Sequence, residues 1–318
     1  MVDYWKYKLT QEDIDIGISD FFTQILIEAR RQKKTARSIE DLSSDNPTIE
    51  YLVGQPGAGK TNLGRCIGEK YQRNGECVLE VGADKIATYH KYYDELIQLL
   101  PNECYTISRE FVKVASPHIY QTIRDNRINI IREISLTKGE KDYNGIEAFK
   151  KQGYRVRINV MAVDKYESFL SCIERDIKLL ELGYDPRPVE RHNHDRMYYP
   201  FLQEIAEISR RGLCDEVNVY ARGRSINMPA LIYTTGETRY ANACDAVSKA
   251  RENEHKRIMS EPVKYLARIK MAREKVNILL SQETMRKKFI SQLAELEREF
   301  VNELSFDRNN NSDGNIEL

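Results

Sequence analysis

One segment constrains the fold of this chain more than any other: Gly54-Gln55-Pro56-Gly57-Ala58-Gly59-Lys60-Thr61. It fits the pattern G-x-x-x-x-G-K-[ST] in full, directly after a short apolar run at residues 49–53 and before a helical pattern at residues 61–74. Such a loop surrounds phosphate with backbone N–H groups, and the N-terminus of the following helix favours an anion. The segment therefore predicts a P-loop that binds nucleotide phosphates.

Within this loop, Lys60 and Thr61 carry the side-chain chemistry. Lys60 supplies a mobile positive charge for the β- and γ-phosphates of ATP, and the Thr61 hydroxyl can bind Mg²⁺. The glycines allow the backbone to wrap closely around the phosphates. We therefore expect ATP and Mg²⁺ as cofactors, with every residue of the loop from Gly54 to Thr61 at the ATP site.

Strand and helix patterns alternate on both sides of the P-loop. Segments that look like strands, in addition to residues 49–53, are 77–81, 128–134, 156–163 and 216–220. Helical patterns separate them at residues 61–74, 92–100, 107–125, 165–182 and 199–211. This alternation predicts an α/β fold with a mostly parallel sheet that is covered by helices on both faces.

The chain is expected to divide into segments of different character. Residues 1–46 form an N-terminal helical segment that contains an amphipathic helix, and residues 47–241 form the P-loop core. Residues 242–305 are rich in Ala, Glu, Lys, Arg and Leu, which indicates a helical extension. Residues 306–318 are too polar to bury and are expected to be a disordered tail.

Charge and hydropathy exclude several classes of protein. The 49 Lys and Arg residues balance the 49 Asp and Glu residues, so a nucleic-acid polymer is not the expected partner. No apolar run is long enough to cross a membrane, and the expected location is the cytoplasm. The 6 cysteines are scattered without zinc-ligand spacing, as is typical of reduced structural thiols.

A P-loop alone does not separate GTPases, motor ATPases and small-molecule kinases. The chain has neither the guanine-binding signature D-x-x-G…[NT]-K-x-D in order nor an apolar run that ends in Asp-Glu. Asp84 follows the strand pattern at residues 77–81, which places it at the carboxyl edge of the sheet together with the P-loop. There a carboxylate can accept the proton of an attacking hydroxyl, although a helix-capping or solvated aspartate is the open alternative.

From Asp84 onward the sequence resembles a known family. Residues 84–96 are similar to the element D-x-F-x-x-x-H-P…Y-x-E-L of zeta toxins, the kinase half of bacterial toxin–antitoxin pairs. Further blocks agree in order: residues 129–135 with N-L-x-I-E-G-T, 151–175 with K-G-Y-E…V-M-A-V…I-E-R-Y, 187–195 with A-R-A-T-P-x-x-x-H-D, and 214–220 with F-x-x-I-x-x-Y. The resemblance extends from Ile49 to Arg222.

This resemblance implies a P-loop kinase fold and an activity. Zeta toxins phosphorylate a nucleotide sugar, typically UDP-N-acetylglucosamine at its 3′-hydroxyl. By motif, Asp84 corresponds to the base and Glu133 to the acid that contacts the sugar, with Ser135 beside it on the acceptor side. Arg175 and Arg187 correspond to the arginines on the phosphate side. The resemblance also implies a small helical antitoxin, similar to epsilon, that obstructs nucleotide access.

The chain departs from the family pattern mainly on the acceptor side. The Gly-Thr pair after the strand acid is Ile134-Ser135, the arginine that usually follows is Thr137, and Lys91 replaces the proline after His90. Two alternatives therefore stay open. One is a P-loop kinase for another acceptor, such as a nucleoside, a dinucleotide or a nucleic-acid end. The other is a non-catalytic ATP-binding module that acts through the C-terminal helices.

Overall fold

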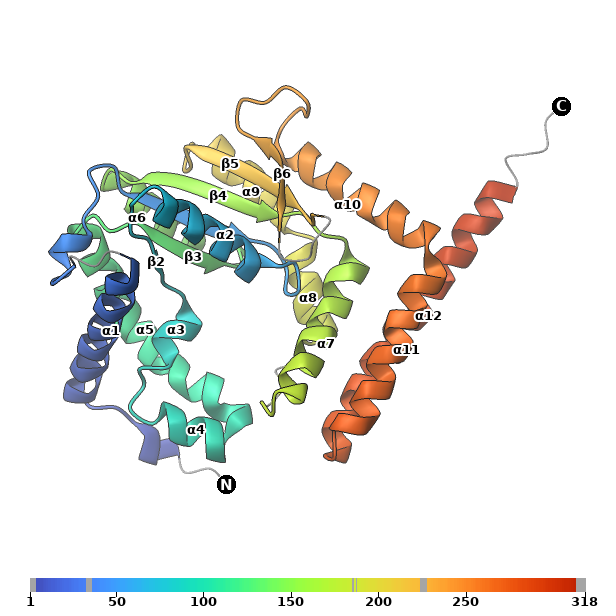
Figure 1. Ribbon diagram of the computed structural model, residues 1–318, viewed down its shortest axis with the longest axis horizontal. Helices are drawn as coiled ribbons and strands as arrows, with labels where there is room; N and C mark the ends of the chain where they lie inside the picture. The colour runs from blue at the N-terminus through green and yellow to red at the C-terminus, as the bar shows by residue number, and fades with distance from the viewer. Residues whose placement is uncertain (1–3, 33–35, 185, 187, 224–227, 313–318) are drawn as a thin grey trace.

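The computed structural model describes residues 4–32, 36–184, 186, 188–223 and 228–312. In this part of the chain, 6 strands form one sheet in the order β2-β3-β1-β4-β5-β6 (Figure 1). Neighbouring strands are parallel except for β6, which pairs antiparallel with β5. The mostly parallel sheet predicted from the sequence is confirmed. The strands are β1 (Thr48–Val53), β2 (Leu79–Glu80), β3 (Ile130–Ile134), β4 (Arg155–Met161), β5 (Glu216–Ala221) and β6 (Ala230–Thr234).

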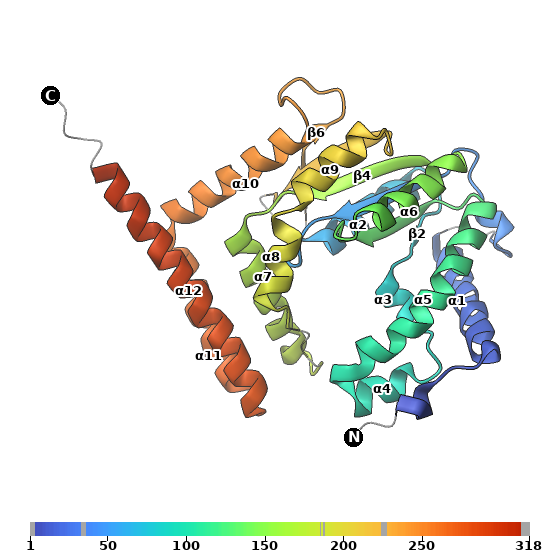
Figure 2. The same ribbon diagram turned by 180° about the vertical axis from the view of Figure 1, so that it is seen from behind.

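Helices cover both faces of this sheet, as expected. On one face lies α2 (Lys60–Arg73), which packs on Leu52 and Ile131. The opposite face is covered by α5 (Pro101–Asp125), α6 (Glu140–Lys151), α9 (Phe201–Arg210) and α10 (Ala243–Ser260). The two views in Figures 1 and 2 show α2 and α9 on opposite sides of the strands. Helix α1 (Gln11–Gln32) packs outside α5.

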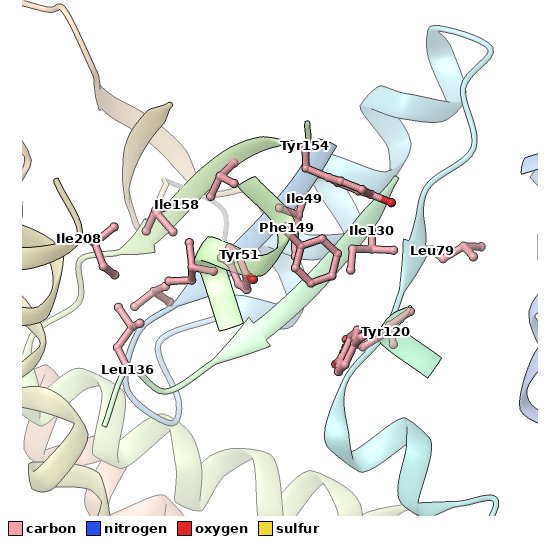
Figure 3. Packing of buried hydrophobic residues seen from close by; sticks show 14 of the residues in the cluster. Ile49, Tyr51, Leu79, Tyr120, Ile130, Leu136, Phe149, Tyr154, Ile158 and Ile208 are labelled. Atoms are coloured by element: carbon pink, nitrogen blue, oxygen red, sulfur yellow. Dashed lines mark hydrogen bonds between the residues drawn. The ribbon is translucent and has the colours of Figure 1, made fainter. Parts of the chain in front are cut away.

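The sequence of β1 is mostly apolar because this strand lies in the middle of the sheet. All its residues are buried, because Ile49 and Tyr51 face the larger core while Leu52 faces α2. Figure 3 shows Ile49, Tyr51 and Phe149 packed together in that larger core. Burying one such side chain contributes about 1.5–3 kcal/mol, so this layer fixes the strand from which the P-loop starts.

Some elements were not predicted from the sequence. Helix α3 (Ala83–Ala87) is only 5 residues long, too short to show a helical period. Edge strand β6 buries only Tyr233, and its short apolar run does not alternate with polar residues as a half-buried strand would. Helix α6 was also missed, because only a few of its residues are buried and the rest of its segment is largely polar. The remaining helices are α4 (Tyr93–Leu99), α7 (Lys165–Glu181), α8 (Arg191–Tyr198) and the short 3-10 turns η1 (Tyr4–Tyr7) and η2 (Glu40–Leu42).

The C-terminal extension is helical throughout its described part. Helices α11 (Pro262–Leu279) and α12 (Glu283–Ser312) follow α10, lie side by side and pack on α7 (Figures 1 and 2). Phe169 and Ile173 of α7 form a second core there with residues such as Ile269 and Phe300.

The end of the chain differs from the prediction. Polarity predicted a disordered tail from residue 306, whereas α12 continues to Ser312. A helix satisfies its own backbone hydrogen bonds, so polar residues can extend it without being buried. Residues 313–318 lie outside the described part of the chain.

Two further observations concern the chain as a whole. No disulfide links any of the cysteines, as expected for reduced thiols. Of the helices in the described ranges, none combines the length and the apolar character that crossing a bilayer requires.

Candidate active site

A cleft of about 1020 Å³ opens at the carboxyl edge of the parallel strands. Because the carboxyl ends of parallel strands meet at one edge, segments far apart in the sequence contribute to it. The P-loop after β1, the segments after β2, β3 and β5, and one side of α7 line the cleft. Most residues that the sequence singled out lie there: Gly54, Pro56, Gly57, Ala58, Gly59, Lys60, Thr61, Asp84, Glu133, Ser135 and Arg175.

Glycines allow the P-loop to lie directly against α7. Gly57 has a φ of +74° and Gly59 a φ of +98°, both in the left-handed region that favours glycine. A Cβ atom on Gly57 would lie 1.9 Å from the Ser168 carbonyl oxygen and 2.8 Å from Cys172 Sγ. No side chain fits between the loop and α7 at this position. The close packing fixes the loop backbone before any phosphate arrives.

Lys60 is the first residue of α2, and its ammonium turns back into the loop. The buried Nζ atom donates to the carbonyl oxygens of Gly54 at 2.8 Å and Gln55 at 3.1 Å. It also lies 3.1 Å from Glu133 Oε1. The positive charge of Lys60 therefore lies where the P-loop meets Glu133. Thr61 follows in the first turn of α2 and is exposed to the cleft.

Gln55 differs from the rest of the P-loop because its side chain is fully buried and does not line the cleft. Its Nε2 atom donates to the Val163 carbonyl at 2.8 Å and to Ser168 Oγ at 3.0 Å. Its Oε1 atom accepts a hydrogen bond from Arg251 of α10 at 3.2 Å. The side chain thus anchors the loop to α7 and α10, and only the backbone of Gln55 faces Lys60.

Carboxylates that follow β2 and belong to β3 line one part of the cleft, which the sequence analysis assigned to the acceptor. Asp84 is exposed and lies in the first turn of α3, which begins shortly after β2 ends at Glu80. Glu133 is half-exposed near the end of β3. The Ser135 Oγ atom lies 3.0 Å from Thr137 Oγ1. The structure brings Asp84, Glu133 and Ser135 into one cleft with the P-loop.

Two of the relevant arginines are described, and they come from different elements. Arg175 of α7 lines the cleft, and its Nε and Nη2 atoms donate to Asp176 Oδ1 at 3.0 and 2.8 Å. Arg187 lies outside the described residues. Sequence reasoning missed Arg222, which directly follows β5 and lines the cleft. The rule that selected Asp84, a polar residue just after a parallel strand, could also have selected Arg222.

Glu80, at the end of β2, is a second cleft residue that the sequence analysis missed. Burial raises the pKa of its carboxyl, Lys85 opposes this effect, and the carboxylates of Glu133 and Glu28 add to it. Lys85 also pairs with Glu28 of α1. Together with Asp84 and Glu133, Glu80 gives the acceptor side an acidic character. The Thr61 hydroxyl, which lines the same cleft, is an oxygen donor of the kind that Mg²⁺ prefers.

The parallel sheet, the P-loop between β1 and α2, and the cleft at the carboxyl edge define a P-loop kinase fold. The family model of zeta toxins matches residues 32–233 of the 318-residue chain. The chain therefore belongs to the zeta toxin family. The match ends before α10, so helices α10, α11 and α12 lie beyond it.

Relatives and solved structures agree with this assignment. Toxin zeta of Streptococcus agalactiae is 26% identical over 208 residues, which cover 65% of this chain and 71% of that protein. Toxin PezT of Streptococcus pneumoniae is 23% identical over 184 residues, covering 58% and 72%. For toxin zeta of Streptococcus pyogenes, the 25% identical region spans only 61% of that protein.

The solved structures are similar in fold. A chain from the PezAT chromosomal toxin–antitoxin system of Streptococcus pneumoniae superimposes with a TM-score of 0.64 at 19% identity, covering 86% of this chain and 99% of that one. A chain of the AvrRxo1-ORF1:-ORF2 complex gives a TM-score of 0.51 at 11% identity, covering 91% and 88%. At these identities the likeness supports the fold alone.

Proposed function

We propose that this protein is a kinase that transfers the γ-phosphate of ATP to a sugar hydroxyl of a nucleotide sugar. The expected acceptor is the 3′-hydroxyl of UDP-N-acetylglucosamine. One observation carries the proposal: Lys60 of the P-loop and the carboxylates of Asp84 and Glu133 line a single cleft. A phosphate-binding loop and a proton acceptor on one cleft are what phosphoryl transfer to a hydroxyl requires. Membership of the zeta toxin family supports the class of acceptor.

Each of these cleft residues has its own role in the proposed phosphoryl transfer. The backbone N–H groups of the P-loop and the Lys60 ammonium bind the β- and γ-phosphates. Asp84 takes the proton of the acceptor hydroxyl while the hydroxyl oxygen bonds to the γ-phosphorus and the bond to the β-phosphate oxygen breaks, releasing ADP. Arg175 and Arg222 offset the negative charge on the phosphates, for which a planar guanidinium is well suited.

Thr61, which lines the cleft beside Lys60, would hold Mg²⁺ through its hydroxyl next to the bound phosphates. A magnesium ion bound there would neutralise part of the phosphate charge and orient the γ-phosphate.

We further propose that the protein is the toxin of a toxin–antitoxin pair. Support comes from the names of its relatives, which include toxin zeta and toxin PezT, and from the PezAT system to which it is structurally similar. The expected partner is a small helical antitoxin that obstructs the nucleotide cleft. The cytoplasm is the expected location of both proteins.

The test is to incubate the purified protein with ATP and Mg²⁺ and a panel of nucleotide sugars, nucleosides, dinucleotides and oligonucleotide ends. Mass spectrometry then reads each acceptor for one added phosphate. We expect the phosphate on UDP-N-acetylglucosamine, at the 3′-hydroxyl by NMR, and none with Lys60→Ala. Phosphate on another acceptor would keep the kinase but replace the substrate. ATP binding without transfer to any acceptor would favour the non-catalytic module.

A further inference from the structure

A buried carboxylate behind the P-loop is shared by two arginines from distant parts of the chain. Glu167 lies in the first turn of α7 with only 7% of its side chain exposed. Its Oε1 atom accepts from Nη1 of Arg222 at 2.7 Å, and its Oε2 atom accepts from Nη1 of Arg268 at 2.7 Å. A buried charge needs such partners, because removal from water is otherwise costly.

Arg222 connects this carboxylate to the phosphate-binding loop. Its Nη2 atom donates to the carbonyl oxygen of Gly57 at 2.7 Å and to Ser171 Oγ at 3.0 Å. Because the guanidinium is planar and rigid, the position of Glu167 sets the angle at which Arg222 meets the loop. A change at Glu167 is therefore transmitted to Gly57.

Arg268 lies on α11, in the extension beyond the family match, and reaches a second carboxylate of α7. Its Nε and Nη2 atoms donate to Glu174 Oε1 at 2.9 Å and Oε2 at 2.7 Å, a two-bond pairing. Glu167, Ser171 and Glu174 are spaced by four and three residues, which places them on one face of α7. Figure 1 shows α11 running alongside this helix.

Glu174 also lines the cleft next to Arg175, and its side chain is 34% exposed. A carboxylate at the wall of a triphosphate site repels the nucleotide unless a cation neutralises it. Arg268 approaches Glu174 from outside the cleft, so it neutralises this charge without occupying the space of the ligand.

We propose that Arg268 is a positioning residue of the phosphate site. It orients Glu167, and through it Arg222 against the P-loop, and it neutralises Glu174 at the cleft wall. This inference rests on the proposed binding of ATP. It gives the C-terminal extension a role in nucleotide affinity, since α11 supplies the cation that pairs with Glu174 at the cleft wall.

The experiment measures binding of a non-hydrolysable ATP analogue with Mg²⁺ by calorimetry, at low and at high salt. For Arg268→Ala we expect the Kd to rise about tenfold at low salt, because Glu174 is left uncompensated. The difference from the wild type should shrink at high salt, which screens this charge. Arg268→Lys, which keeps the charge and loses the two-bond pairing, should be intermediate.

Two further variants separate this role from general support of the fold. Adding Glu174→Gln to Arg268→Ala removes the uncompensated charge and should recover most, but not all, of the lost affinity, because the contact of Arg268 with Glu167 stays lost. Arg273→Ala, which breaks the pair between Arg273 of α11 and Glu297 of α12, should leave the Kd unchanged. Circular dichroism and thermal melting confirm that each variant is folded.

The results of this experiment distinguish a failure of the Arg268 proposal from a failure of the proposed kinase function. If the wild type binds the analogue and Arg268→Ala binds it equally well, the role of Arg268 is refuted while the kinase proposal stands. If Glu174→Gln does not restore affinity, the neutralising role is refuted. If the wild type binds no analogue, the proposed function and this inference both fail.

Discussion

The Lys60 ammonium lies 3.1 Å from Glu133 Oε1. The two residues are separated by a long stretch of sequence, but β1 and β3 are parallel neighbours in which Leu52 pairs with Glu133. The P-loop therefore starts beside a carboxylate near the end of β3. If ATP binds as proposed, its phosphates compete with Glu133 for the positive charge of Lys60. The pair joins the P-loop to the end of β3 within one cleft.

Glu133→Gln should tighten the binding of ATP. The substitution removes the carboxylate that competes with phosphate for Lys60, and a partly exposed pair of this kind contributes about 0.2–1 kcal/mol, so the Kd should fall by at most about fivefold. At the same time, the KM for the acceptor should rise, because the acidic contact is lost. Calorimetry with an ATP analogue and steady-state kinetics measure the two effects. Weaker ATP binding would contradict this account of the pair.

Asp84→Asn should abolish transfer and leave nucleotide binding intact. The amide cannot accept the hydroxyl proton, so we expect kcat to fall about 10²- to 10⁴-fold, the usual contribution of a general base. The Kd for ATP should not change, since Asp84 lies on the acceptor side. Asp20→Asn, at an exposed position of α1, is the matched control. Transfer at the wild-type rate by Asp84→Asn would refute the assignment of the base.

Gly57→Ala and Gly75→Ala form a matched pair. Both glycines have a φ of +74°, but a Cβ atom on Gly75 meets nothing within 4 Å, whereas on Gly57 it would meet the Ser168 carbonyl at 1.9 Å. Gly75→Ala should cost only the backbone strain, about 1–2 kcal/mol. Gly57→Ala should lower the free energy of unfolding by clearly more than this, and the variant should also lose ATP binding. Urea denaturation and calorimetry measure both; equal losses of stability would show that the contact with α7 is unimportant.

Glu254→Gln should stabilise the protein at alkaline pH. Burial raises the pKa of this carboxyl from 4.5 to about 7, so between these values the folded chain binds the proton more tightly than the unfolded chain. The stability of the wild type therefore falls as the pH rises from 4.5 to 7, by up to about 3 kcal/mol. The glutamine never ionises, and its oxygen can still accept the backbone N–H of Asp164.

Urea denaturation at pH 5 and pH 8 tests this prediction. The free energy of unfolding of Glu254→Gln should exceed that of the wild type at pH 8 and be similar to it at pH 5. Glu274→Gln, at an exposed position of α11, should show no such difference. A gain for Glu254→Gln that is the same at both pH values would contradict the raised pKa.

Much of the fold followed from local patterns. The short apolar run at residues 49–53 predicted the strand found as β1, and the helical pattern at residues 165–182 predicted the helix found as α7. These patterns are readable because burial imposes a period on the sequence. Among the elements that were missed, α3 and edge strand β6 are short or exposed, so burial imposed little pattern on them, and α6 buries few residues of a largely polar segment.

The candidate site, like the fold, was predicted from the sequence only in part. The P-loop could be identified because its glycines and Lys60 must be contiguous to surround a phosphate. The position of Asp84 at the edge of the sheet followed from the end of a strand. The assignments of Asp84, Glu133, Ser135 and Arg175 to catalysis or binding remain predictions until the variants are measured.

The sequence by itself determined the phosphate-binding loop, the mostly parallel sheet and the family, because each depends on neighbouring residues or on ordered motifs. Only the tertiary structure decided that Lys60 pairs with Glu133, that the Gln55 side chain faces away from the cleft, and that Arg268 reaches the back of the phosphate site. These contacts join residues that are remote in the chain. They depend on strand order and helix packing, which no local pattern encodes.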